Sequence, residues 1–131
     1  MTDAPDYAAT MPFAVQLGIR IPSATPEEVI GELDWAPDRT TLGGALHGGV
    51  LMSFADSVGA VCAFLNLPPG ASTSTTSSST VFVRRVRAGT VSATAHPLHV
   101  GRSTIAITTQ LRDDEGRVVA QVTQTQAVLQ P

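Results

Sequence analysis

The chain has 131 residues, of which 43% are hydrophobic and 15% are charged, and its net charge is -3. This composition suits one folded domain with an apolar core and excludes a disordered chain, and the negative charge argues against general nucleic-acid binding. The one cysteine, Cys62, cannot form an internal disulfide, and the N-terminus has no signal-peptide pattern, so we expect a cytoplasmic protein.

The first third of the chain predicts a tail, a short helix, two strands and a loop. Residues 1–11 are expected to form a loose tail, followed by a short helix over residues 12–17. Two strands are predicted over residues 18–21 and 29–35, and the stretch 36–45, which contains glycine and proline, is expected to be a loop.

An apolar stripe at helical spacing predicts one long helix. The stripe consists of Leu51, Ala55, Val58, Cys62 and Leu65. The helix is expected to end before the Pro-Pro-Gly corner at 68–70. A stretch this apolar could also cross a membrane, but Asp56 lies near its centre, which would cost about 2.5–3.5 kcal/mol on insertion. We therefore expect a buried core helix and no membrane partner.

Consecutive hydroxyl residues, STSTTSSST at positions 72–80, are compatible with two structures. Composition alone favours a flexible linker between two domains, whereas the β-branched threonines and the apolar residues that follow favour a strand. A linker needs a self-sufficient domain on each side, and neither half of this chain has enough elements to enclose a core. We therefore predict a strand, and a single domain over residues 12–131.

The remaining C-terminal residues alternate between apolar and polar, as half-buried strands do. The alternating runs begin at Val91, Ile105 and Val118, with turns at Gly101 and at the hairpin 113–116 between them. With the hydroxyl run as first strand, they predict an antiparallel meander. The predicted fold class is α+β, with one long central helix wrapped by a strongly curved antiparallel sheet of five or six strands.

Asp56 is the one Asp, Glu, Lys or Arg in the range 41–82, and it lies in the most apolar helix. A buried carboxylate without a partner is costly, so a purely structural role would need a backbone cap or an arginine across an interface. The functional alternative is a catalytic base or nucleophile. The sequence His47-Gly48-Gly49 before the helix supports the functional alternative, because glycines and free N–H groups at a helix start can hold a developing oxyanion.

The segment HGGVLMSFAD, at positions 47–56, resembles the signature of the hotdog-fold acyl-CoA thioesterases. The branch that it resembles includes the phenylacetate-pathway and 4-hydroxybenzoyl-CoA enzymes. The segments 82–89, 99–103 and 114–120 are similar to strand and turn segments of the same family. The resemblance runs from about Leu17 to the C-terminus and implies the hotdog fold.

The resemblance implies an enzyme that hydrolyses an aryl- or short- to medium-chain acyl-CoA to the free acid and CoA. Asp56 would activate water or attack the thioester carbonyl, the Gly48 N–H would hold the thioester oxygen, and His47 would orient the site. The family's hydroxyl residue on the strand after the helix corresponds to Thr75. The family's site lies between two subunits, so a homodimer is expected, and paired sheets would allow a tetramer.

The resemblance also implies which residues hold the substrate. The expected substrate- and CoA-binding residues are Gly49, Thr41, Arg84, Arg85, Arg87, Arg102 and Ser103. All 8 basic residues are arginines, and five of them lie in the acid-free range 57–112, which suits a local phosphate-binding patch on an acidic protein. Coenzyme A is expected as part of the substrate, with no other cofactor, and the histidines and the cysteine lack metal-ligand spacing.

Two departures from the family pattern leave alternatives open. Thr41 stands where the family usually has Asn or Gln, and Arg85 stands where it usually has proline. The first departure favours a non-catalytic acyl-CoA or aromatic-ligand binding protein on the same fold, and a hotdog-fold enoyl-CoA hydratase or dehydratase is a third hypothesis. A register shift of two residues would also move the hydroxyl role from Thr75 to Thr73 or Ser77, which are expected to share its face.

Overall fold

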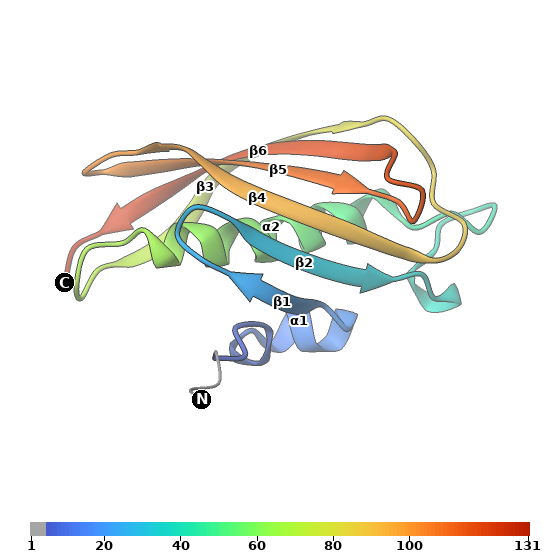
Figure 1. Ribbon diagram of the computed structural model, residues 1–131, viewed down its shortest axis with the longest axis horizontal. Coiled ribbons are helices and arrows are strands. Elements are labelled where there is room, and N and C mark those ends of the chain that lie inside the picture. Colours follow the sequence, from blue (N-terminus) through green and yellow to red (C-terminus); the bar gives the residue numbers. More distant parts are fainter. Residues whose placement is uncertain (1–4) are drawn as a thin grey trace.

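The structure of the protein is a computed structural model that describes residues 5–131 (Figure 1). Its elements, where η marks a 3-10 turn, are η1 (Ala8–Thr10), α1 (Pro12–Leu17), β1 (Arg20–Ala24), β2 (Val29–Asp34), η2 (Pro37–Arg39), α2 (Gly48–Leu65), β3 (Ser72–Phe82), β4 (Thr90–Val100), β5 (Thr104–Arg112) and β6 (Val118–Leu129). The strands form one six-stranded sheet, and α2 lies along its concave face (Figure 1). The predicted α+β class with one long central helix is confirmed.

The sheet has the strand order β1-β2-β4-β5-β6-β3, and every neighbouring pair is antiparallel. The predicted meander is present in β4, β5 and β6, but the placement of the hydroxyl strand as its first member is wrong. Because β4 is already paired on both sides, by β2 and β5, the hydroxyl strand pairs with β6 at the edge of the sheet. The connection over residues 83–89 carries the chain back to β4 (Figure 1).

The hydroxyl run is a strand and not a linker, since β3 covers Ser72–Phe82. Its register against β6 pairs Thr75 with Gln126 and Ser78 with Gln124, and an irregularity lies between Thr75 and Ser77. Such a bulge adds one residue and inverts the alternation of faces beyond it. Gln124 and Gln126 are buried under the helix, so Thr75 and Ser78 face inward. The expectation that Ser77 shares the face of Thr75 is therefore wrong.

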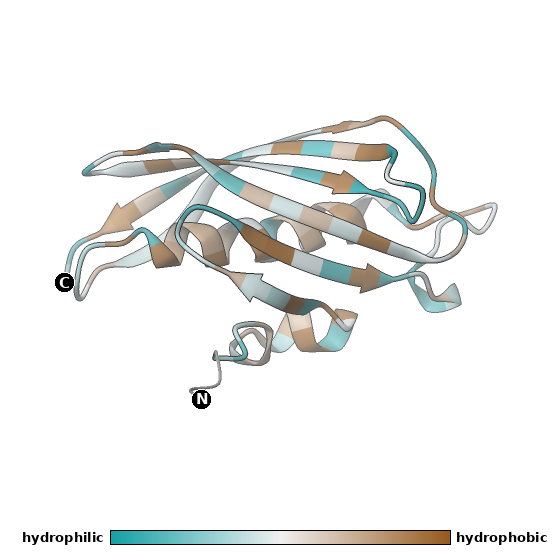
Figure 2. Ribbon diagram, in the orientation of Figure 1, coloured by the Kyte–Doolittle hydropathy of each residue, from teal (hydrophilic) through white to brown (hydrophobic). Residues whose placement is uncertain are grey.

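The helix α2 is held close to the sheet by small residues and by its own apolar surface. Its buried residues are Leu51, Phe54, Ala55, Ser57, Val58, Gly59, Val61, Cys62 and Ala63. Gly31 of β2 permits the close approach, because an added Cβ there would lie 2.5 Å from Val58 Cγ2 and 3.0 Å from Phe54 Cε1. By length and composition α2 could span a bilayer, but in this fold most of its apolar residues belong to the core, while Met52 and Phe64 are exposed. Figure 2 shows the apolar colouring of this helix beneath the sheet.

Part of the expected N-terminal tail, from Tyr7 onward, packs against the rest of the chain. Residues 1–4 of that expected tail lie outside the described residues. Ala8 is buried within the turn η1, and the ring of Tyr7 packs edge-on against Phe64 of α2 with centroids 6.4 Å apart. The predicted short helix over 12–17 is present as α1. The segment from Tyr7 onward therefore covers part of the helix.

Candidate active site

The carboxylate of Asp56 projects from the middle of α2 toward β3 and β6. Its Oδ1 accepts two hydrogen bonds, from Thr75 Oγ1 at 2.9 Å and from Gln124 Nε2 at 3.0 Å. Its Oδ2 has no hydrogen-bond partner among residues 5–131, and this atom is not fully buried. One carboxylate oxygen is thus held by the protein, while the other is open to solvent.

A second layer of hydrogen bonds holds Thr75. Gln126 Nε2 donates to Thr75 Oγ1 at 2.8 Å, and Thr73 Oγ1 lies 3.1 Å from Gln126 Oε1. The resemblance placed Thr75 beside Asp56, and the structure brings the two side chains together. Gln124 and Gln126 did not figure among the expected site residues. They lie two and four residues after the buried Val122 and therefore on the same face of β6. The alternation along β6 could thus have identified them as inward-facing.

The start of α2 offers one backbone N–H without a protein partner. His47 is the N-cap, and its Nδ1 accepts a hydrogen bond from the Gly49 N–H at 2.8 Å. The N–H groups of Val50 and Leu51 both donate to the His47 carbonyl. Among the described residues, nothing accepts from the Gly48 N–H. It lies at the positive end of the helix dipole, where an oxyanion is stabilised.

The cap also fixes the tautomer of His47. Because Nδ1 accepts from Gly49, the neutral ring carries its proton on Nε2. The side chain is exposed, so this Nε2–H is available to a group outside the chain. His47 is not among the hydrogen-bond partners of Asp56.

A pocket of about 600 Å³ surrounds the helix start. It is lined by Thr41, Leu42, Ala45, Leu46, Gly48, Leu51, Phe82, Val83, Arg84, Arg85 and Val86. The structure therefore brings Thr41, Gly48, Arg84 and Arg85 together, as expected for one substrate site. Thr41 also closes the loop before the helix, because its N–H donates to the Ala45 carbonyl at 2.8 Å.

Asp56 does not line this pocket, because it lies further along the helix. Eight residues separate Gly48 from Asp56, and at a rise of 1.5 Å per residue their backbones are about 12 Å apart along the axis. A thioester carbonyl bound at the Gly48 N–H is thus out of reach of the Asp56 carboxylate of the same chain. One chain alone does not assemble the expected catalytic set.

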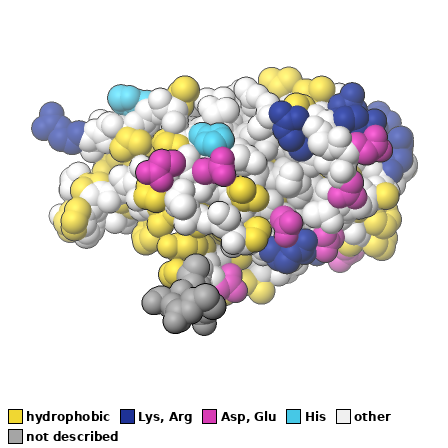
Figure 3. Space-filling model, in the orientation of Figure 1, with side chains coloured by type: hydrophobic (Ala, Val, Ile, Leu, Met, Phe, Trp, Pro, Cys, Tyr) yellow, Lys and Arg dark blue, Asp and Glu magenta, His cyan; other side chains and the backbone are white. Residues whose placement is uncertain are grey.

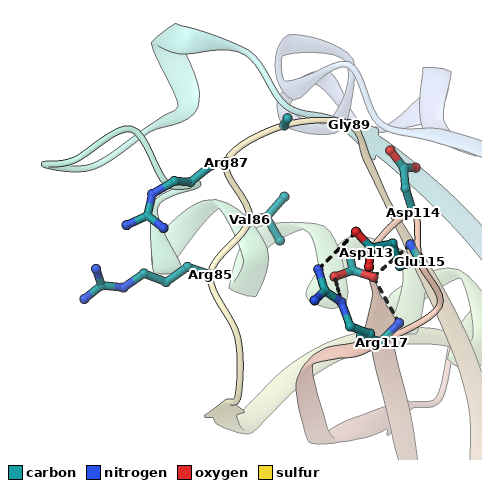
Figure 4. Close-up of a pocket in the computed structure, with 9 residues that line it drawn as sticks. Arg85, Val86, Arg87, Gly89, Asp113, Asp114, Glu115 and Arg117 are labelled. Atoms are coloured by element: carbon teal, nitrogen blue, oxygen red, sulfur yellow. Dashed lines mark hydrogen bonds and ion pairs between the residues drawn. The ribbon is translucent and has the colours of Figure 1, made fainter.

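Arginines gather at the end of the molecule that contains the β3–β4 connection (Figure 3). A second pocket of about 340 Å³ lies there, between residues 85–89 and the β5–β6 hairpin. Arg117 is committed to acidic partners, with Nε 2.9 Å from Asp113 Oδ2. Arg85 and Arg87 extend away from that acidic cluster (Figure 4). Arg85 and Arg87 are therefore available to an anionic ligand at this end.

Arg102 and Ser103 are not part of this cluster. Both lie in the turn between β4 and β5, which is at the opposite end of the sheet from the β3–β4 connection (Figure 1). The Ser103 carbonyl accepts a hydrogen bond from the Val128 N–H at 2.9 Å. Within one chain, these two residues are remote from the other expected binding residues.

A third pocket is apolar and has a volume of about 590 Å³. It is lined by Pro5, Tyr7, Thr10, Met11, Ala60, Val61, Phe64 and Thr73. Ala60 lies one helical turn beyond Asp56 and on the same side of α2. Thr73 belongs to the hydrogen-bond network of Gln126 and Thr75. The pocket thus lies about one helical turn from Asp56, toward the C-terminal end of α2.

Comparison with known proteins gives a consistent family. Residues 43–120 match the family model described as "Thioesterase superfamily". The chain is 35% identical over 127 residues to the "Putative esterase Rv1847" of Mycobacterium tuberculosis, which covers 92% of this chain and 91% of that protein. The solved structure of that protein superposes with a TM-score of 0.89 at 32% identity, over 92% of this chain and 98% of the other.

Two further solved structures share the architecture. A mutant of the thioesterase PA1618 from Pseudomonas aeruginosa has a TM-score of 0.90 at 25% identity, over 97% of this chain and 96% of the other. The thioesterase HI1161 from Haemophilus influenzae has a TM-score of 0.86 at 24% identity, over 90% of this chain and 82% of the other. The latter similarity concerns the fold alone.

Proposed function

The chain belongs to the thioesterase superfamily, and we propose that it hydrolyses an aryl- or short- to medium-chain acyl-CoA to the free acid and coenzyme A. We place it in the branch that includes the phenylacetate-pathway and 4-hydroxybenzoyl-CoA enzymes. The observation that carries the proposal is the state of Asp56, whose Oδ1 is held by two donors while Oδ2 stays open. Neither the formation of α2 nor its packing against the sheet requires a carboxylate at that position.

The proposed chemistry uses Asp56 Oδ2 in one of two ways. As a general base, it takes a proton from water while the water oxygen attacks the thioester carbon. As a nucleophile, it attacks that carbon itself, and water then cleaves the resulting anhydride. In both cases the Gly48 N–H donates to the oxyanion, the C–S bond breaks, and CoA leaves as the thiol after protonation. A general base contributes roughly 10²–10⁴ in rate, and one oxyanion donor roughly 10²–10³.

We further propose that two subunits complete each site, with Asp56 of one chain acting with the Gly48 N–H of the other. The separation of about 12 Å within one chain supports this arrangement. So does β3, an 11-residue edge strand whose last two residues are exposed, Val81 by 64% and Phe82 by 50%. Long exposed edge strands are usually paired or covered in native proteins, and a second copy of β3 would cover this one.

Subunit complementation tests this arrangement. Asp56→Asn and His47→Ala chains are each expected to be inactive as homodimers. Mixed dimers are expected to regain up to half of the wild-type turnover per dimer, because one of their two sites contains both native residues. A mixture that stays inactive after verified subunit exchange would place the site within one chain.

The ligand regions support the choice of substrate. Arg85 and Arg87 have no acidic partner among residues 5–131 and offer positive charge for the CoA phosphates, with Arg84 beside them in the pocket at the helix start. The apolar pocket beside Ala60 and Phe64 suits the acyl group, and its volume of about 590 Å³ lies inside the range of about 300–1,000 Å³ found for ligand pockets. An aryl or medium-length acyl chain fits such a space.

Purified protein with a panel of acyl-CoA esters and a thiol reagent tests the proposal directly. We expect CoA release from aryl or medium-chain esters, with slower release from long-chain ones. Tight CoA binding without turnover would instead favour a non-catalytic acyl-CoA binding protein. The feature that favours that alternative is Thr41, which lines the pocket at the helix start without the amide that the family usually has there.

A further inference from the structure

Two glutamines lie on the core-facing side of β6. Gln124 and Gln126 are each 1% exposed, and they follow Val122, which is fully buried on the same face. A buried amide is unfavourable unless its donors and acceptor are satisfied. Valine or leucine at these positions would continue the apolar face without that cost. Two consecutive inward-facing glutamines therefore call for a reason other than packing.

Two features of the structure around Gln124 are unfavourable for the stability of the fold. Its Nε2 donates to Asp56 Oδ1, but its Oε1 is buried without a hydrogen-bond partner among the described residues. The amide fits only because residue 59 of α2 is glycine, since an added Cβ there would overlap Gln124 Oε1. Glycine in the interior of a helix is itself unfavourable. Both features serve the contact with Asp56 and nothing else that the structure shows.

Gln126 acts on Asp56 through Thr75. A threonine hydroxyl has one hydrogen to donate and lone pairs to accept. Because Thr75 Oγ1 accepts from Gln126 Nε2 at 2.8 Å, its hydrogen is directed to Asp56 Oδ1 at 2.9 Å. The bulge in β3 after Thr75 keeps Thr75 on the inward face opposite Gln126. The hydrogen bonds from Gln126 to Thr75 and from Thr75 to Asp56 are thus both donated toward the carboxylate.

We propose that Gln124 and Gln126 are positioning residues for the proposed hydrolysis, which fix Asp56 so that Oδ2 is the oxygen that reacts. Gln124 donates to Oδ1 directly, and Gln126 directs the Thr75 hydroxyl to the same oxygen, so together they set the rotation of the carboxylate. Oδ2 then faces the open side, where water and the thioester carbon approach. The inference rests on the proposed function, and it assigns roles to two residues outside the catalytic set.

The test compares four variants on the acyl-CoA that the wild type hydrolyses best. Gln124→Leu and Gln126→Leu each remove one donor, and Gly59→Ala displaces the Gln124 amide without changing it. Gln121→Leu is the matched control, since Gln121 lies on the same strand with its exposed side chain hydrogen-bonded to Gln110 on the outer face. We expect kcat to fall about 10–100-fold in Gln124→Leu and Gly59→Ala, which lose a hydrogen bond to the charged carboxylate. In Gln126→Leu, which loses a hydrogen bond to the neutral Thr75 hydroxyl, we expect a fall of about 2–10-fold.

The split between the kinetic constants distinguishes positioning from a general structural effect. KM is expected to stay within about twofold, because the lost interaction acts on the reacting group and not on substrate binding. Gln121→Leu is expected to match the wild type in both constants. Folded, active variants of Gln124 and Gln126 with wild-type kcat would overturn the inference, whereas an inactive wild type would instead contradict the proposed function.

A spectroscopic readout does not depend on turnover. The side-chain amide signals of Gln124 are expected to move in Asp56→Ala, because the amide loses the carboxylate oxygen to which it donates. The signals of Gln121, on the outer face, should stay where they are in the wild type. Gln124 amide signals that are the same in both proteins would show that Gln124 does not hold the carboxylate, against the inference.

Discussion

Replacing Thr75 with valine removes one hydroxyl while keeping a β-branched side chain of the same shape. In the structure, that hydroxyl donates to Asp56 Oδ1 at 2.9 Å and accepts from Gln126 Nε2 at 2.8 Å. Its loss leaves the Gln126 amide without a partner at a residue that is 1% exposed. A buried donor without a partner costs about 1–3 kcal/mol, and the exposure of Thr75 itself favours the lower half of that range.

A destabilisation of 1–2 kcal/mol would lower the melting temperature by roughly 3–10 °C in a domain of this size. The same substitution should reduce kcat by about 10–100-fold, because the carboxylate loses a charge-assisted hydrogen bond. Thermal unfolding by circular dichroism and CoA release measure the two effects. Thr123→Val, on the exposed face of β6, is the matched control and should change stability by less than about 0.5 kcal/mol. Thr75→Val with wild-type stability and turnover, or equal losses in the control, would refute the reasoning.

Three further predictions concern other parts of the fold. The hydrogen bond from Arg20 lowers the pKa of Asp34 to about 2. The contribution of the Asp34 carboxylate to stability is therefore present above the ordinary pKa of 3.8 and is lost as the pH falls through about 2. Asp34→Asn should flatten the fall in melting temperature between those two pH values, and an unchanged slope would contradict this. Burial raises the pKa of the Cys62 thiol to about 11, so a thiol reagent at neutral pH should label it only after denaturation, and rapid labelling of the native protein would show that the thiol is accessible. Gly31→Ala should destabilise the protein by about 1–3 kcal/mol, because the added methyl group would overpack against Val58. Urea unfolding measures this change. A neutral or stabilising effect would contradict the close packing of Gly31 against α2.

Local sequence patterns predicted the long helix and the C-terminal strands, whereas the first strand lies at Arg20–Ala24 and not at residues 18–21. The stripe from Leu51 to Leu65 predicted α2, and the lack of a self-sufficient core on either side identified the hydroxyl run as a strand. Strand partners were not predictable in the same way. Alternation says which face a residue occupies but not which strand lies beside it, so the pairing of β3 with β6 instead of β4 emerged only from the three-dimensional closure of the sheet.

The candidate site was predictable in part. Asp56 was identified from charge isolation and Thr75 from resemblance, and the structure brings them together. The bulge after Thr75 could not be predicted, because no glycine or proline marks it in a run of serines and threonines, and it moved the inward position from Ser77 to Ser78. Gln124 was not among the expected site residues, although it lies two residues after the buried Val122 and therefore on the same face of β6.

The turnover of Asp56→Asn is the measurement that tests the proposed catalytic role most directly. The substitution keeps the size of the side chain and an oxygen for Thr75 to donate to, but it removes the negative charge needed to activate water or attack the thioester. On the best acyl-CoA of the wild type, kcat should fall by at least roughly 10²–10⁴-fold while the fold and the oligomeric state are retained. Turnover of Asp56→Asn close to that of the wild type would contradict the assignment of Asp56 as the catalytic carboxylate.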